Sequence, residues 1–269
     1  MRLIIDNDKF QLYARTDYVL SEITLLNSAS IVGATSITVV NPSGFATNDF
    51  ILIEDIGNER AEMRQITVSG NDFAITALSF AHTSKVKIYR LQYNKVKFFE
   101  GDTVLATVDI TPDYFTKTTV DVVDTNEYSI AYLNSASSEE TPEGEVLNGY
   151  EYNLCSIGDC LQYESNGIDF GRMLDKINIA SREIRSMFIS QDQNFTDLSS
   201  RDIGRLREPC SLRALYFNFV ELIKNDDDVP SKKAELYMGL YNAKLKEIMD
   251  VINKENDNIA IWGQTRALR

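Results

Sequence analysis

The first candidates for catalysis are acidic side chains that gather around one predicted turn. Two carboxylates can serve as general acid and general base when their surroundings separate their pKa values. Carboxylates in turns and at strand edges are usually solvated, however, because water stabilises their charge. We therefore interpret the group as surface charge, and a metal-independent hydrolase that uses Glu59 and Glu62 stays as an alternative. The group consists of Glu54, Asp55, Glu59 and Glu62.

The chain has a single histidine, His82, in a predicted turn just before the strand-like residues 85–89. A histidine with no second histidine or cysteine near it in sequence lacks the ligands that a zinc site needs. A Ser–His–Asp triad would need a positioned serine, and the sequence has no GxSxG elbow. We therefore expect His82 to make structural hydrogen bonds.

Three cysteines and a run of aspartates complete the candidate chemistry. Cys155, Cys160 and Cys210 are an odd number without a CxxC pair, which favours free or buried thiols, although Cys155 and Cys160 can share one loop. The aspartates at 226–228 lack the glycine and distal glutamate of an EF-hand, so they predict a solvated loop between helices. The sequence predicts no catalytic residue, no metal and no cofactor, and we do not expect an enzyme.

Charge is distributed unevenly along the chain. The 269 residues include 40 acidic and 27 basic side chains, a net charge of −13, which argues against general binding to nucleic acid or to anionic membranes. Residues 1–160 hold 11 basic and 23 acidic side chains, whereas residues 161–269 hold 16 and 17. No window reaches the about 18 apolar residues of a membrane helix, and the N-terminus has no signal-peptide pattern. We expect a protein made in a reducing cytoplasm, whose two halves face different partners.

Two kinds of hydrophobic periodicity divide the chain. From residue 31 to about 133, short bursts with a period of two alternate with turn residues, which predicts an antiparallel β region. Residues 134–149 are polar and predict a linker or exposed loop. After residue 168 apolar residues recur every three or four positions, which predicts amphipathic helices, with an interruption at Pro209 and an N-cap at Ser231.

The segment 256–269 has no apolar period and contains the one tryptophan, Trp262. An aromatic side chain in such a segment either packs on its own domain or anchors in a neighbour, and both readings stay open. Residues 259–262 can also add as a strand to another chain.

Residues 33–90 resemble a small β module of tailed-bacteriophage virion proteins. The resemblance lies in a GATS start, a Gly-Phe turn followed by an aspartate, a central strand with glutamates, and an Ala-His pair ahead of a valine. The chain departs from the pattern at Thr47 and Asn48, where a glycine is usual. The resemblance implies an architectural role for these residues and names no active site. They are Gly33, Ala34, Thr35, Ser36, Gly44, Phe45, Asp49, Glu59, Glu62, Ala81, His82 and Val86.

Two further stretches carry a resemblance. Residues 211–252 resemble the helical hairpin of phage head–tail connector (adaptor) proteins, in which an apolar helix with Tyr and Phe, an acidic loop and a lysine-rich helix follow one another. Residues 128–135 and 139–142 resemble the closing strand of a fibronectin-like fold. The chain is thus similar to a tailed-bacteriophage head–tail connector with a virion-type β module.

We therefore predict an α+β protein in which N-terminal antiparallel β modules, as small barrels or sandwiches, precede a C-terminal α-helical domain. The predicted β region is 1–149, with the phage-type module at 31–91 and fibronectin-like strands at 92–145. The predicted helical adaptor-like domain is 150–255, and the predicted C-terminal docking tail is 256–269.

The resemblance also implies a function and partners. It implies a dodecameric ring in the virion, assembled in the host cytoplasm and seated between portal and tail proteins, through which DNA passes without specific binding during packaging and ejection. No membrane is implied. The alternative is another virion structural protein of the tail or baseplate, or a β module that binds a host surface or glycan. We expect portal contact through Ile259, Ile261, Trp262, Arg266 and Arg269.

Overall fold

The computed structural model describes residues 3–142, 144–168, 170–190, 195, 198–225 and 228–267, with the backbone alone at 170, 189–190 and 253–267. The chain forms two compact units, Met1–Tyr150 and Glu151–Arg269. Strands fill the first and helices the second, which confirms the predicted α+β class. No helix in the described part of the chain is both long enough and apolar enough to cross a membrane.

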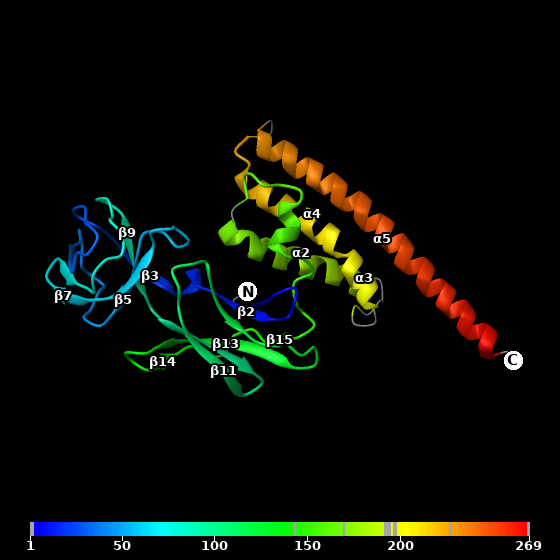
Figure 1. Cartoon of the computed structure of the whole chain (residues 1–269), viewed down its shortest axis with the longest axis horizontal. Helices are drawn as coiled ribbons and strands as arrows, with labels where there is room; N and C mark the ends of the chain where they lie inside the picture. The colour runs from blue at the N-terminus through cyan, green and yellow to red at the C-terminus, as the bar shows by residue number, and fades with distance from the viewer. Residues whose placement is uncertain are drawn as a thin grey trace. The chain divides into compact units, whose positions relative to one another are not determined.

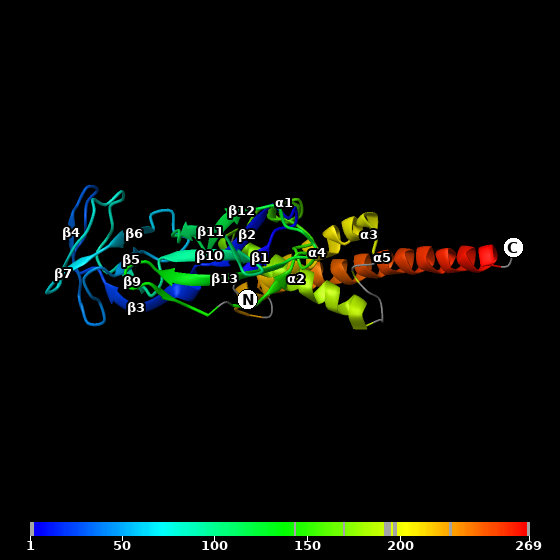
Figure 2. The same cartoon turned by 90° about the horizontal axis from the view of Figure 1, so that it is seen from below.

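The first unit contains a two-sheet module at residues 20–91 (Figures 1 and 2). One sheet has the strand order β3-β9-β5-β6 and the other β4-β8-β7, and both are open, with no closed barrel among these strands. Aliphatic and aromatic residues of both sheets share one core, as expected for strands with period-two patterning. The strands are β3 (Leu20–Leu25), β4 (Ser36–Thr38), β5 (Phe50–Ile53), β6 (Glu62–Gln65), β7 (Thr67–Ser69), β8 (Asp72–Ala74) and β9 (Lys87–Leu91).

The remaining strands of the first unit come from both sides of that module in sequence. One sheet has the order β1-β2-β12, so β2 pairs with a strand about 100 residues later in the sequence. The other sheet has the order β11-β10-β13-β14, with β15 also paired to β13. The predicted group of fibronectin-like strands at 92–145 did not include β1 and β2, so the pairing of β2 with β12 was not predicted. They are β1 (Leu3–Ile5), β2 (Gln11–Arg15), β10 (Lys95–Glu100), β11 (Thr103–Asp109), β12 (Phe115–Thr119), β13 (Glu127–Asn134), β14 (Glu139–Glu140) and β15 (Leu147–Asn148), with the 3-10 helix η1 (Asp17–Val19) after β2.

Most of the described part of the segment 134–149 is turn or loop, as predicted, but the segment also pairs with β13 at two places, which was not predicted. Its residues form β14 and β15, and both pair with β13 in antiparallel register. The polar composition that suggested a loop fits short edge strands, which face water on one side.

Gly149, directly after β15, lies against the backbone of another turn. A Cβ at this position would stand 2.0 Å from the carbonyl oxygen of Val123 and 2.6 Å from its carbon, and backbone atoms cannot turn aside as a side chain can. We expect Gly149→Ala to lower the free energy of unfolding by about 3 kcal/mol. Gly204→Ala is the control, since nothing lies within 4 Å of its Cβ position. Denaturant unfolding followed by circular dichroism compares the two, and equal effects would refute the clash.

The second unit contains five helices in its described residues. Figure 1 shows α4 beside α5, and the buried residues of α2, α4 and α5 form one core. Their apolar positions recur at helical spacing, as predicted. The helices are α1 (Ile157–Leu161), α2 (Phe170–Ser190), α3 (Ser200–Arg205), α4 (Arg207–Leu222) and α5 (Val229–Ala267).

Two helix boundaries differ from their predictions for local reasons. The break between α3 and α4 falls at Leu206, and Pro209 lies in the first turn of α4, where its missing N–H costs nothing. At the start of α5 the capping side chain is Asp228, whose Oδ1 accepts a hydrogen bond from the backbone N–H of Ser231 at 2.8 Å. Ser231 was the predicted N-cap, but it lies inside the helix.

The predicted tail at 256–269 is continuous with α5 as far as Ala267. Its backbone is helical there, so residues 259–262 do not form the strand that was one predicted option. Figures 1 and 2 both show the C-terminal end of α5 continuing past the other helices of its unit.

Candidate functional site

The residues expected to contact the portal fall where the structure gives no side chains. Ile259, Ile261, Trp262 and Arg266 lie on the described backbone of α5, but their side chains are outside the description, and Arg269 lies outside the described residues altogether. The proposal that they bind a portal therefore rests on the sequence. The described surface of the same unit offers a different candidate.

That candidate begins with an apolar strip on the outside of α5. Leu236 and Leu240 are 55% and 43% exposed, and Ala243 is exposed as well. Their spacing of four and three residues places them on one line of the helix. The core-facing residues of α5, which include Tyr237, Tyr241 and Leu245, occupy a separate line. We call Leu236, Leu240 and Ala243 the α5 stripe.

A groove runs along one side of the α5 stripe. It has a volume of about 200 Å³, and its apolar lining comes from Leu212 of α4 with Leu240 and Ala243 of α5. Lys244 crosses it, with Nζ at 3.2 Å from a carboxylate oxygen of Glu208 and at 3.2 Å from one of Glu247. These ion pairs are exposed and contribute little to stability, so their main effect is on which surfaces can approach.

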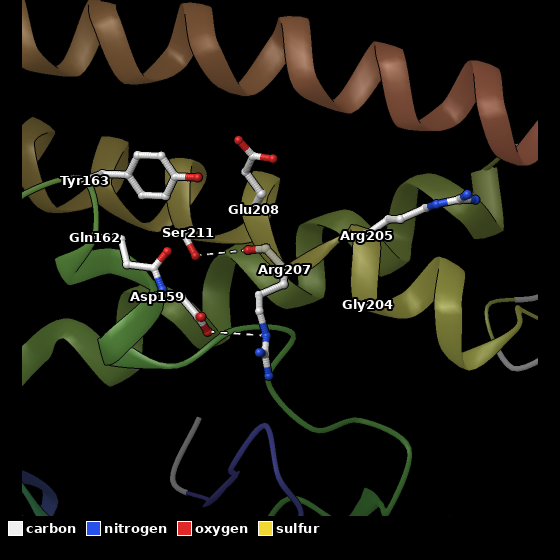
Figure 3. Close-up of a pocket in the computed structure, with 8 residues that line it drawn as sticks. All are labelled: Asp159, Gln162, Tyr163, Gly204, Arg205, Arg207, Glu208 and Ser211. Atoms are coloured by element: carbon white, nitrogen blue, oxygen red, sulfur yellow. Dashed lines mark hydrogen bonds and ion pairs between the residues drawn. The ribbon is translucent and has the colours of Figure 1, made fainter.

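A more polar hollow of about 340 Å³ adjoins the groove and shares Tyr163 and Glu208 with it (Figure 3). Figure 3 shows Glu208 and Arg207 on opposite sides of α4. Arg207 Nε is 3.5 Å from the carboxylate of Asp159, and that carboxylate also caps α1 by accepting from the backbone N–H of Ser156 at 2.7 Å. The lining of this polar hollow comes from α1 and the residues after it, from α3 and from α4, whereas the smaller hollow lies between α4 and α5. We call the two adjoining hollows together the α4–α5 groove.

The lining of the α4–α5 groove combines polar, charged and apolar side chains. Ser211 Oγ donates to the carbonyl of Arg207 at 3.0 Å, one turn earlier in the same helix. Burial, followed by the hydrogen bond to Glu208, raises the pKa of Tyr163, so this phenol stays protonated at neutral pH. Apolar contact and paired charges are what the groove offers.

The acidic candidates of the first unit separate into buried and exposed residues. Glu59 is exposed, as predicted, but Glu62 is buried with 4% exposure, so its prediction as a solvated surface charge was wrong. Glu62 pairs with Arg64 on the same face of β6 and accepts the backbone N–H of Ser79 at 2.9 Å.

His82 completes this network. Its Nε2 is 2.7 Å from Glu62 Oε1 and its Nδ1 is 2.9 Å from Glu54 Oε1, and its side chain has no exposure. Each ring nitrogen of His82 therefore faces a carboxylate oxygen. His82 thus joins the end of β5, the start of β6 and its own loop, which confirms the expected structural hydrogen bonding. We call Glu54, Glu62, Arg64 and His82 the buried ion network.

The buried ion network predicts how stability depends on pH. Burial alone would raise the pKa of Glu62, but hydrogen bonds from two backbone N–H groups and from His82, together with the charge of Arg64, outweigh it and lower the pKa. A lowered carboxyl pKa stabilises the fold above the unfolded value of about 4.3 and loses this effect as pH falls through the folded value. We expect thermal unfolding by near-ultraviolet circular dichroism to show a smaller loss between pH 6 and pH 3 in Glu62→Gln than in the parent. Parallel curves would contradict this.

The cysteines, the described aspartate of 226–228 and the exposed aromatics lie in separate parts of the described chain. All three cysteines are free and buried, as expected. Asp228 caps α5, whereas 226 and 227 lie outside the described residues. Across the part of the chain that the structure describes, no three His, Cys, Asp or Glu side chains are placed to hold a metal ion. The exposed aromatics among the described residues of the first unit, Phe10, Tyr18, Phe80 and Tyr150, come from separate segments of the sequence.

Comparison with known proteins adds little to this picture. No protein-family model and no curated protein matches the chain. Among solved structures, it is similar to one described as the Gp54 tailspike of Acinetobacter baumannii bacteriophage AP22 in complex with A. baumannii capsular saccharide, at 17% identity and a TM-score of 0.23. The similar part covers 26% of this chain and 14% of that chain, and we base no conclusion on it.

Proposed function

We propose that the chain is a structural virion protein that forms a ring between the portal and the tail of a bacteriophage. In this role it is a head–tail adaptor, and DNA passes through the ring during packaging and ejection. Its partners are further copies of itself, the portal protein, and tail or tail-completion proteins. Another structural component of the virion is the alternative within the same class.

The observation that carries the proposal is the exposed apolar α5 stripe beside the α4–α5 groove. Single exposed leucines are common, but adjacent ones beside an apolar groove mark a surface that another protein covers. The unit that carries them is also the less acidic part of the chain. Residues 151–269 hold 16 basic and 19 acidic side chains, against 11 and 21 in residues 1–150, so copies can approach there with less repulsion than the first unit would cause.

Charge also supports the role proposed for DNA. The excess of 12 acidic side chains in residues 1–160 repels phosphate, so DNA is cargo that moves past the protein without binding. The C-terminal residues 259–269 remain the proposed portal contact, because Trp262, Arg266 and Arg269 combine an aromatic anchor with positive charge.

Electron microscopy and native mass spectrometry of the purified full chain test the proposal, alone and mixed with the portal protein of the same phage. We expect a closed ring of roughly 12 copies, either free or added as one layer to the portal. A chain that stays monomeric in both samples would overturn the adaptor proposal. Deleting residues 256–269 tests the portal contact separately, since that variant should still form rings if the α5 stripe holds them together.

A further inference from the structure

Two thiols from distant parts of the second unit meet in its core. Cys155, just ahead of α1, has its Sγ 3.2 Å from Sγ of Cys210 in α4, and both side chains are fully buried. Ser181 of α2 supports the pair, since its hydroxyl lies 3.3 Å from Cys210 Sγ and accepts the backbone N–H of Leu154 at 2.8 Å. The contact therefore joins the segment before α1 to two helices.

We propose that Cys155 and Cys210 are an oxidative modification site, and that they form a disulfide when the protein leaves a reducing cytoplasm. A disulfide has a sulfur–sulfur length of about 2.05 Å, so the two sulfurs need to approach by about 1.2 Å. The two cysteines are 55 residues apart in sequence, so their spacing is not that of a CxxC motif. The sequence alone suggested proximity only for Cys155 and Cys160, which can share one loop.

The chemistry balances with a small oxidant such as hydrogen peroxide. One thiolate attacks a peroxide oxygen, the O–O bond breaks, and a sulfenic acid and a water molecule form. The second sulfur then attacks the sulfenyl sulfur, the S–O bond breaks, and the hydroxyl leaves as a second water molecule. Two thiols have lost two electrons and two protons, and peroxide has been reduced to two molecules of water.

Because both thiols are buried, the reaction is slow and proceeds only under oxidising conditions. Burial raises the pKa of the Cys210 thiol well above its usual range, and it raises that of Cys155 likewise, with a further contribution from Cys160. Little thiolate exists at neutral pH, so oxidation needs local opening of the core and a small oxidant. In a reducing cytoplasm the thiols stay free, whereas prolonged exposure outside the cell allows the bond to form.

The bond would act on the unfolded chain. Closing a loop of 55 residues removes conformational freedom from the unfolded state and leaves the folded helices nearly in place. We expect the Tm of the second unit to rise by about 5–15 °C on oxidation and to return with dithiothreitol.

Cys160 is the competing thiol, because it also hydrogen-bonds to Cys155. It is fully buried like the other two, and its Sγ faces the carbonyl of Ser211 at 3.9 Å. The full chain is treated with hydrogen peroxide, alkylated with N-ethylmaleimide under denaturing conditions, and digested without reductant for mass spectrometry. We expect a peptide that joins Cys155 to Cys210, with Cys160 alkylated.

Three variants sharpen the test. Cys160→Ser should keep both the cross-linked peptide and the rise in Tm, whereas Cys155→Ser and Cys210→Ser should lose both. A bridge between Cys155 and Cys160, sulfinic acid at the pair, or three alkylated thiols after oxidation would each overturn the proposal. The peptide map of the parent chain decides the question even if a variant fails to fold.

Discussion

Glu62→Gln is expected to lower the free energy of unfolding of the 20–91 module by about 3–5 kcal/mol at neutral pH. The reason is the number of donors that meet at one carboxylate. Arg64, the imidazole of His82 and two backbone N–H groups all approach its two oxygens. Glutamine has the same shape but offers one accepting oxygen and turns an NH₂ group toward donors. The guanidinium of Arg64, whose side chain is 15% exposed, would then lose its counter-charge.

Hydrogen–deuterium exchange measures the loss of stability within the 20–91 module itself. Protection of the amides in β5, β6 and β9 reports on the module, whereas the one tryptophan belongs to the second unit and would not report on it. Glu59→Gln is the matched control, because Glu59 is an exposed glutamate three residues earlier. We expect that control to change stability by less than about 0.5 kcal/mol. Equal losses in both variants would mean that the buried ion network does not hold the module together.

The same residue explains what could and could not be predicted about the acidic cluster. A glutamate next to a turn is usually solvated, and the sequence around Glu62 gives no apolar signal against that expectation. The missed signal was the pair Glu62 and Arg64, because residues two apart on a strand share one face. His82 lies in a loop that pairs with Ser30 in an isolated antiparallel bridge, and a non-local bridge of this kind gives no periodic signal in the sequence.

Features of the fold that depend on residues close in sequence could be predicted, whereas features that depend on distant segments could not. The period of two predicted the β character of residues 31–133, and the period of 3.6 predicted helices after residue 168, since each depends on residues that are close in sequence. The pairing of β2 with β12 depends on segments about 100 residues apart, and no spacing rule specifies such a partner. The Cys155–Cys210 contact is hidden for the same reason. The α4–α5 groove needs Leu212 and Leu240 side by side, and only the packing of the two helices puts them there.

Changing Leu236 and Leu240 to glutamate in the same chain is expected to abolish assembly while leaving the monomer folded. Both side chains are about half exposed, so the unassembled chain should lose less than about 1 kcal/mol. In an assembled ring the two new carboxylates would lie without partners in an apolar contact. We expect association between copies to weaken at least about 100-fold, which corresponds to about 3 kcal/mol.

A control with equal exposure separates a specific contact from a general effect of charge. Val104 and Val123 are 47% and 48% exposed in the first unit, so their double change to glutamate adds the same charge to a surface outside the α5 stripe. Sedimentation velocity and electron microscopy should show rings for this control and monomers for the Leu236 and Leu240 variant, with matching circular dichroism. Rings in both variants would remove the α5 stripe from the interface. If the parent chain forms no ring alone, the Leu236 and Leu240 variant and its control are compared for binding to the portal protein. Loss of binding in the Leu236 and Leu240 variant only would mean that the α5 stripe contacts the portal and not another copy of the chain.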